Sequence, residues 1–346
     1  MKCVTAFALL IALTSPATGD DSKAEPPAKP QAIEGAALLR QEAAALRPLV
    51  KSAVAGRFLR KTADLPAYAP RSIYRNPKTR EYFCKAEAEK LDETERDALD
   101  PIEVSESFYY TTKFGTPMAY SRVLELLGRA GLSDLSEKRV MDFGCGTIGH
   151  LRLMASCGAD AVGVDVDSLL RAMYCEPGDQ GLVKNPEGPN GKVSMVIGRW
   201  PAEPKAKDAV AGGFDLITSK NTLKNGFFHP ERPVPKNRLV DVGVDDATFV
   251  KSLFDALNPG GMMMIYNICP APSKPHEPYK HWADGRCPFP KTMLESAGFD
   301  ILAFDRDDSE AVRKMAHALG WDRGERPMDL ENDLFAHYTL LKKPKQ

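Results

Sequence analysis

The stretch Arg139-Val-Met-Asp-Phe-Gly-Cys-Gly-Thr-Ile-Gly-His150 decides the fold of this chain. Here an apolar run ends in an acid and turns on glycines into a segment that we expect to be helical. A second apolar run, Ala161-Val-Gly-Val-Asp165, ends in another acid about twenty residues later. Glycines let the backbone approach a ligand closely, the helix N-terminus offers free N–H groups, and the second acid can accept hydrogen bonds from ribose hydroxyls. The pattern predicts a site for a cofactor that contains an adenine nucleoside.

Two classes of cofactor fit this pattern. The spacing Gly144-x-Gly146-x-x-Gly149, with Asp165 further on, matches the dinucleotide fingerprint and leaves an NAD-dependent dehydrogenase as one alternative. Asp142 argues against that alternative, because its carboxylate would lie close to a pyrophosphate. The same acid can face a cationic ammonium or sulfonium group.

Two later segments extend the pattern. Gly213-Phe-Asp-Leu-Ile-Thr218 has the character of a short buried strand, and Ala256-Leu-Asn-Pro-Gly-Gly-Met-Met-Met-Ile-Tyr-Asn267 that of a helix end, a tight turn and another buried strand. With them the chain resembles the class I S-adenosylmethionine-dependent methyltransferases over roughly residues 116–343. The matching motifs are Asp142-Phe-Gly-Cys-Gly-Thr, Asp165, Phe214-Asp-Leu-Ile and Leu257-Asn-Pro-Gly-Gly, in the order of the family.

The resemblance implies an α/β fold: a doubly wound, seven-stranded Rossmann-like sheet whose last strand is antiparallel, with S-adenosyl-L-methionine as cofactor. Strands are expected near 138–142, 161–165, 192–197, 213–218, 262–268, 299–304 and 337–341. Ahead of this domain (116–346) we expect a signal peptide (1–19), a disordered linker (20–33) and an N-terminal helical lobe (34–115), with helices at 35–62, interrupted near Pro48, and at 79–99.

The cofactor residues are assigned by the resemblance and by their place at strand ends. The candidates are Tyr110, Lys113, Asp142, Gly144, Cys145, Gly146, Asp165, Val166, Arg199, Trp200 and Ser219. The usual acid at the end of the third strand is replaced by Gly198-Arg199-Trp200, so the adenine is expected to stack on Trp200. Tyr110, Lys113 and Phe114 are candidates for a lid over the cofactor or, alternatively, for an aromatic latch between the lobe and the core.

The catalytic candidates follow the fourth strand, where the family presents such groups. They are Lys220, Asn221 and His229. His229 has the more suitable ordinary pKa for a base, whereas the pKa of Lys220 would have to be lowered by burial. The alternative is that Lys220 and His229 only bond loop carbonyls. The long connections at 219–245 and 267–290 are therefore the expected substrate region, for a small molecule with an O, N or S nucleophile.

Other partners are not expected. The net charge of −1 gives no overall footprint for nucleic acid, and the histidine and cysteine spacing predicts no metal site. Met1-Lys2, the apolar run to Leu13 and the small residues to Gly19 predict a secretory signal peptide. The protein would then be exported, periplasmic or extracellular, without a stable membrane span, unless the segment stays uncleaved as an anchor.

Export leaves a second functional class open. S-adenosylmethionine is made in the cytosol, so an exported chain could be a binding protein that keeps the methyltransferase fold without turnover. Cys269 and Cys287 flank a proline-rich loop and are the most favoured pair if a disulfide forms, while the pairing of the cysteines is left open.

Overall fold

The computed structural model describes residues 34–345. The predicted signal peptide and linker lie outside these residues. In the described part of the chain, no helix is both long and apolar enough to cross a membrane.

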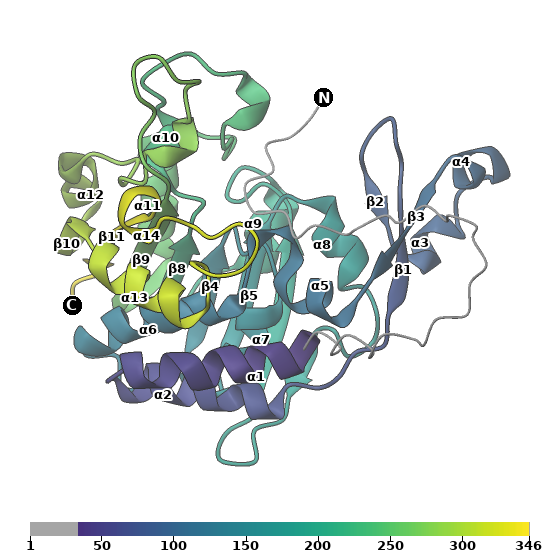
Figure 1. Ribbon diagram of the computed structural model, residues 1–346, viewed down its shortest axis with the longest axis horizontal. Coiled ribbons are helices and arrows are strands. Elements are labelled where there is room, and N and C mark those ends of the chain that lie inside the picture. The colour runs from purple at the N-terminus through teal and green to yellow at the C-terminus, as the bar shows by residue number, and fades with distance from the viewer. Residues whose placement is uncertain (1–33, 346) are drawn as a thin grey trace, which may run out of the picture.

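The centre of the molecule is one mostly parallel sheet in the order β10-β11-β9-β8-β4-β5-β7-β6 (Figure 1). Its strands are β4 (Arg139–Phe143), β5 (Asp160–Asp165), β6 (Gly181–Val183), β7 (Gly191–Ile197), β8 (Phe214–Lys220), β9 (Leu257–Cys269), β10 (Asp300–Asp307) and β11 (Phe335–Lys342). β4 pairs in parallel with β5 and β8, and β11 runs antiparallel between β9 and β10. The predicted fold class is confirmed, with one correction: β6 adds an eighth strand, antiparallel to β7. This three-residue strand is too short to show a periodic pattern.

Helices cover both faces of the sheet. One face carries α6 (Tyr120–Arg129) and α7 (Gly149–Ser156), and the other carries α9 (Pro204–Val210), α11 (Asp246–Ala256) and α12 (Lys291–Ala297). Apolar side chains such as Leu124 and Leu151 fill the first layer, and Phe249 and Leu294 the second. Since both faces are covered, the carboxyl edge of the parallel strands is the place where a ligand can reach them.

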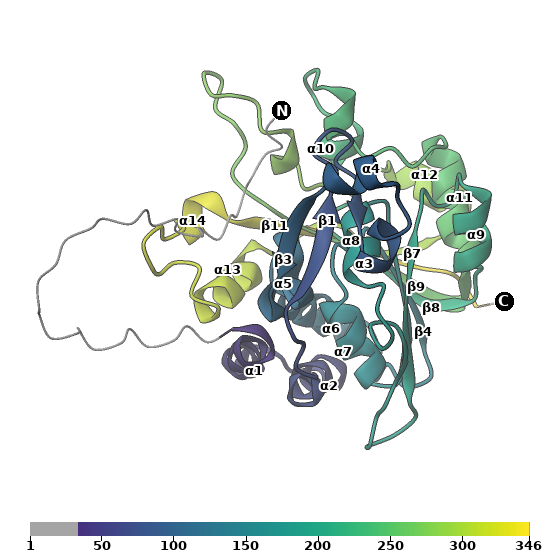
Figure 2. The ribbon, with the colours of Figure 1, turned by 90° about the vertical axis from the view of Figure 1, so that its right-hand side faces the viewer.

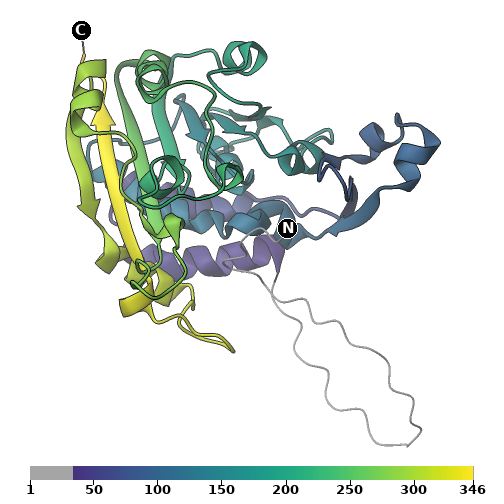
Figure 3. The same ribbon diagram turned by 90° about the horizontal axis from the view of Figure 1, so that it is seen from above.

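The N-terminal lobe contains helices and a small sheet. α1 (Gly35–Leu46) and α2 (Ala53–Arg60) lie side by side below α6 and α7 (Figure 2), and Pro48 stands in the predicted break between them. β1 (Arg71–Arg75), β2 (Tyr82–Phe83) and β3 (Asp100–Val104) then form an antiparallel sheet that projects from the main sheet (Figure 3). α5 (Glu106–Thr111) leads from this sheet into the core.

The expected helix over 79–99 is wrong. The segment contains β2 and two short helices, α3 (Lys85–Ala88) and α4 (Glu93–Asp97). The Asp92 side chain accepts from the N–H of Glu95 at 2.8 Å and so starts a new helix inside the charged run. The favoured pairing of Cys269 with Cys287 is also wrong, because both are buried free thiols.

Candidate active site

The glycine-rich turn follows β4 and is held by the end of β5. Gly144 and Gly146 have φ angles of 70° and 63°, a region that favours glycine. The N–H of Gly144 donates to the carbonyl of Val164 at 2.8 Å, and the N–H of Gly146 donates to Oδ2 of Asp165 at 2.9 Å. The second strand and the turn are thereby fixed to each other at the carboxyl edge.

Asp165 is a largely desolvated carboxylate. Its Oδ1 accepts from the backbone N–H groups of Val166 at 2.7 Å and Asp167 at 3.0 Å. Among the described residues no lysine or arginine pairs with it, and burial raises the pKa of its carboxyl. Each carboxylate oxygen can accept a further hydrogen bond. Beside it, the Val166 side chain is 66% exposed, which leaves an apolar surface next to the acid.

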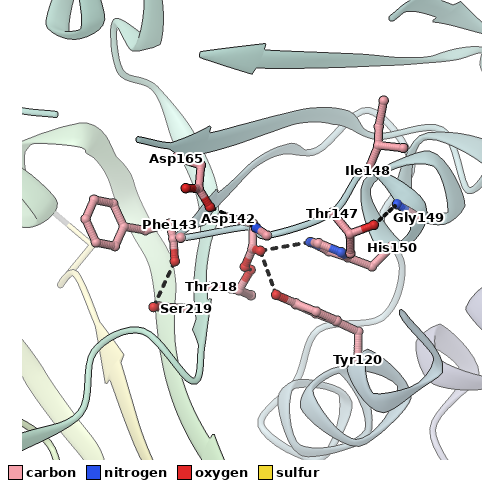
Figure 4. A network of polar contacts seen from close by, with 12 residues as sticks. Tyr120, Asp142, Phe143, Thr147, Ile148, Gly149, His150, Asp165, Thr218 and Ser219 are labelled. Carbon is pink, nitrogen blue, oxygen red and sulfur yellow. Dashed lines mark hydrogen bonds and ion pairs between the residues drawn. The ribbon is translucent and has the colours of Figure 1, made fainter. Parts of the chain in front are cut away.

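Asp142 stands at the centre of a buried network (Figure 4). It is fully buried and accepts from the Tyr120 hydroxyl at 2.6 Å, from His150 Nε2 at 2.8 Å and from the Thr218 hydroxyl at 2.5 Å. The expectation that Asp142 faces a cationic ligand group is therefore wrong. The acid fastens α6, α7 and β8 together beneath the glycine-rich turn.

Lys220 ends β8 beside this network. Its Nζ lies 5.4 Å from the ring centroid of Tyr120, and that ring stacks on His150 at 3.8 Å. Burial lowers the pKa of Lys220 to about 8, against an opposing effect of the Asp142 charge. Within residues 34–345 the Lys220 ammonium makes no ion pair and no hydrogen bond to a loop carbonyl. The predicted requirement for Lys220, a pKa lowered by burial, is met.

The other two catalytic candidates are engaged elsewhere. Asn221 uses its Oδ1 to accept from the N–H of Ile268 at 2.7 Å, which joins β8 to β9. His229 is half-exposed at the end of α10 (Asn225–Phe228), and its Nε2 lies 2.8 Å from a carboxylate oxygen of Asp246 on α11. Neither side chain joins the group around Lys220.

A loop carbonyl is bound instead by Lys224, which the sequence analysis did not select. Its Nζ donates to the carbonyl of Ile268 at 2.6 Å, and burial lowers its pKa to about 8. Lys224 is thus a second buried lysine near Lys220, and the positive charge of Lys220 contributes to lowering its pKa.

Residues 110–114 contain both a latch to the N-terminal lobe and side chains placed as a lid. Tyr110 is fully buried, and its hydroxyl donates to the carbonyl of Pro66 at 2.5 Å, so it is a latch to the lobe. Lys113 pairs at 2.8 Å with Asp167, two residues beyond Asp165. Phe114 is 51% exposed, and its side chain packs next to Gly146. Lys113 and Phe114 therefore lie over the glycine-rich turn, as a lid would.

Several remaining cofactor candidates point into the core. Trp200 is 3% exposed and packs between Phe143 and Phe249, so the expected stacking of adenine on this ring is wrong. The Cys145 thiol is buried against Gly163, and the Ser219 hydroxyl donates to the carbonyl of Phe143 at 2.9 Å.

Two further side chains lie near this edge. Arg199, one of the cofactor candidates, pairs with Asp241 at 3.4 Å. Thr222, which the sequence analysis passed over, packs directly on Gly144 and donates to its carbonyl at 3.2 Å. No signal in the sequence distinguished Thr222 from other polar residues of the long loop.

Comparison with known proteins agrees with this geometry. A family profile described as a methyltransferase domain matches residues 118–304, and the chain belongs to this family. The matched profile describes a methyltransferase domain, which argues against the dehydrogenase alternative. No curated protein matches the chain in sequence.

Solved structures resemble it only in fold. Phosphoethanolamine N-methyltransferase 2 of Haemonchus contortus is 14% identical, with a TM-score of 0.42 over 71% of this chain and 63% of that protein. The chain thus spans less than two thirds of that relative. Magnesium protoporphyrin IX methyltransferase of Synechocystis is 14% identical, with a TM-score of 0.33 over 66% of this chain and 79% of that protein.

The described residues fit S-adenosylmethionine at one place. Asp165 offers a desolvated carboxylate to ribose hydroxyls, and the exposed side chains of Val166 and Phe114 offer apolar surface beside it. On the same edge, Phe114 lies against Gly146 and Thr222 against Gly144. The Phe114 and Thr222 side chains therefore occupy the space next to the two glycines.

Proposed function

We propose that this protein methylates an O, N or S atom of a small molecule and that Lys220 accepts the proton of the attacking atom. The observation that carries the proposal is the Lys220 amine, which has a lowered pKa, lacks an ion-pair partner among residues 34–345 and ends the strand next to the glycine-rich turn. When bound, S-adenosylmethionine supplies an electrophilic methyl carbon.

The surroundings of Lys220 suit a proton acceptor that works near neutral pH. With a pKa of about 8, half of the amine is unprotonated at pH 8, whereas an ordinary lysine is less than about 1% unprotonated at that pH. Once protonated, the ammonium is stabilised by the face of the Tyr120 ring. Asp165 would hold the ribose, and Val166 and Phe114 would enclose the adenosine part.

The cofactor is tested first. Calorimetric titration of the protein with S-adenosylmethionine, S-adenosylhomocysteine and NAD should show micromolar binding of the first two and none of NAD. A screen with radiolabelled methyl donor and a panel of phenols, amines, thiols and carboxylic acids then searches for the acceptor.

Lys220→Met tests the base. It should bind the cofactor normally and lower turnover by about 10²-fold to 10⁴-fold, the usual contribution of a general base. Lys251→Met is the matched control, because Lys251 lies exposed on α11 and pairs with Asp255. Full turnover by Lys220→Met would remove Lys220 from this role.

The second candidate function is a binding protein without turnover. It is favoured by the positions of Phe114 and Thr222, which cover the glycines where the cofactor would approach. Failure of all three titrations, for the wild type and for Phe114→Ala, would support this candidate over the enzyme.

Export is proposed separately on the basis of residues 1–19. Expression of the full chain with its native N-terminus, followed by N-terminal sequencing of the secreted product, tests it. A start at Thr18 or Asp20 is expected, and retention of Met1 in the cytosolic fraction would contradict export.

A further inference from the structure

Two cysteines outside the candidate active site come from different parts of the chain. Cys84 is buried between β2 and α3 in the N-terminal lobe, and Cys175 is exposed just after α8 (Ser168–Met173) of the core. Ninety residues of chain separate them. The other four cysteines among residues 34–345 are buried.

The elements that carry the two cysteines are docked on each other. The N–H of Tyr82 on β2 donates to the Ser168 hydroxyl at the start of α8, at 3.2 Å. From the same helix, Arg171 donates to the carbonyl of Tyr82 at 3.0 Å. The backbone N–H and carbonyl of Tyr82 are therefore both bound by side chains of α8.

The side chains next to the cysteines bring the two thiols together. Arg171 reaches Glu87 at 3.3 Å, and the Glu87 carboxylate accepts from the N–H of Cys84 at 3.0 Å. Cys175 follows the end of α8 by two residues, which keeps it near the β2–α3 segment on which this helix docks. The Cys84 side chain acts directly on the Cys175 thiol and raises its pKa, so the two thiols are neighbours.

We infer that Cys84 and Cys175 are a site of disulfide formation that fastens the N-terminal lobe to the core. The oxidant is a small-molecule or protein disulfide, for which oxidised glutathione is the probe. The exposed Cys175 thiolate attacks one sulfur of glutathione disulfide and releases one glutathione thiolate. The Cys84 thiolate then attacks the Cys175 sulfur of the mixed disulfide and releases the second. Two protein thiols are oxidised, one glutathione disulfide is reduced to two glutathione thiols, and the two protons lost by the protein thiols are taken up by the two glutathione thiolates.

The surroundings favour a lasting bond over a rapid switch. Burial and the neighbouring Cys84 raise the pKa of the Cys175 thiol to about 12, so its reactive thiolate is scarce at neutral pH. Exchange depends on the thiolate, so the reaction is slow without a catalyst. The bond would join β2 to α8, the helix that begins directly after the Asp165–Asp167 segment.

The experiment uses the full chain purified under reducing conditions. It is equilibrated with glutathione buffers from fully reduced to fully oxidised at pH 8.5, quenched by alkylation, digested and analysed by mass spectrometry. The expected result is a linked pair of peptides containing Cys84 and Cys175, together with an increase in Tm on oxidation. Cys175→Ser should abolish both, whereas Cys157→Ala should keep both.

The peptide measurement on the wild type decides the proposal even if a variant fails to fold. Alkylated thiols at both positions in fully oxidised buffer would overturn it. So would a glutathione adduct that persists on Cys175 while Cys84 stays alkylated.

Discussion

Replacing Lys220 with methionine should make the protein more stable at pH 7 while it removes the proposed base. Methionine keeps the length of the side chain but carries no charge. A lysine whose pKa falls from 10.5 to about 8 on folding costs about 3 kcal/mol in the folded state while it stays protonated. Lys220→Met removes this cost and also loses the contact of Nζ with the Tyr120 ring, which is worth about 1 kcal/mol. The expected net gain at pH 7 is about 1–2 kcal/mol.

The pH dependence of this gain identifies its origin. Below pH 8 the lysine is protonated in both folded and unfolded states, so the full cost is present. Between pH 8 and 10.5 the folded protein releases the proton and the unfolded chain keeps it, so the wild type gains stability relative to the variant. The advantage of Lys220→Met should therefore disappear as the pH rises through this window.

The assay is urea denaturation of the wild type, Lys220→Met and the exposed control Lys251→Met at half-unit steps from pH 6.5 to 10.5. Other groups titrate in this range, but they are common to all three proteins and cancel in the differences. A variant that is less stable than the wild type at pH 7, or a difference that does not change with pH, would refute the assignment of Lys220 as a desolvated amine.

Three further substitutions test cofactor binding, turnover and the stability of the network around Asp142. Asp165→Ala should weaken cofactor binding by about 1–3 kcal/mol in calorimetry, because a buried charged acceptor is lost, and unchanged affinity would contradict the ribose contact. His229→Ala should keep full turnover, because His229 pairs with Asp246 away from Lys220. Loss of turnover with normal cofactor binding would instead identify His229 as the base. Tyr120→Phe should lower the free energy of unfolding by about 1–3 kcal/mol through the lost bond to Asp142, yet leave the midpoint of the pH–rate profile near 8, because the ring remains. A midpoint shifted by a full unit would show that the Tyr120 hydroxyl, and not burial alone, sets the pKa of Lys220.

The sequence predicted the main sheet because its strands have local signatures. β4, β5 and β8 are largely apolar runs with most residues buried, each with a polar residue at or next to its carboxyl end, and glycines mark the turn after β4. The small sheet of the lobe escaped prediction because its strands are short and only partly buried. Their pairing partners lie up to 33 residues apart, from Arg71 to Val104, in a charged segment in which no periodicity appears.

The sequence by itself therefore determined the fold class, the family and the two acids near the carboxyl ends of β4 and β5. Only the tertiary structure decided what those acids do. Asp142 and Asp165 have the same side chain at equivalent strand ends, but Asp142 is enclosed by Tyr120, His150 and Thr218, while Asp165 is held by backbone N–H groups and keeps acceptor capacity beside the exposed Val166.

The choice of the proposed base was likewise decided only by the tertiary structure. His229 has the ordinary pKa that suits a base, yet Lys220 has the position and the environment. A pKa depends on burial and on neighbouring charges, and both are set by residues distant in the chain that only folding brings together.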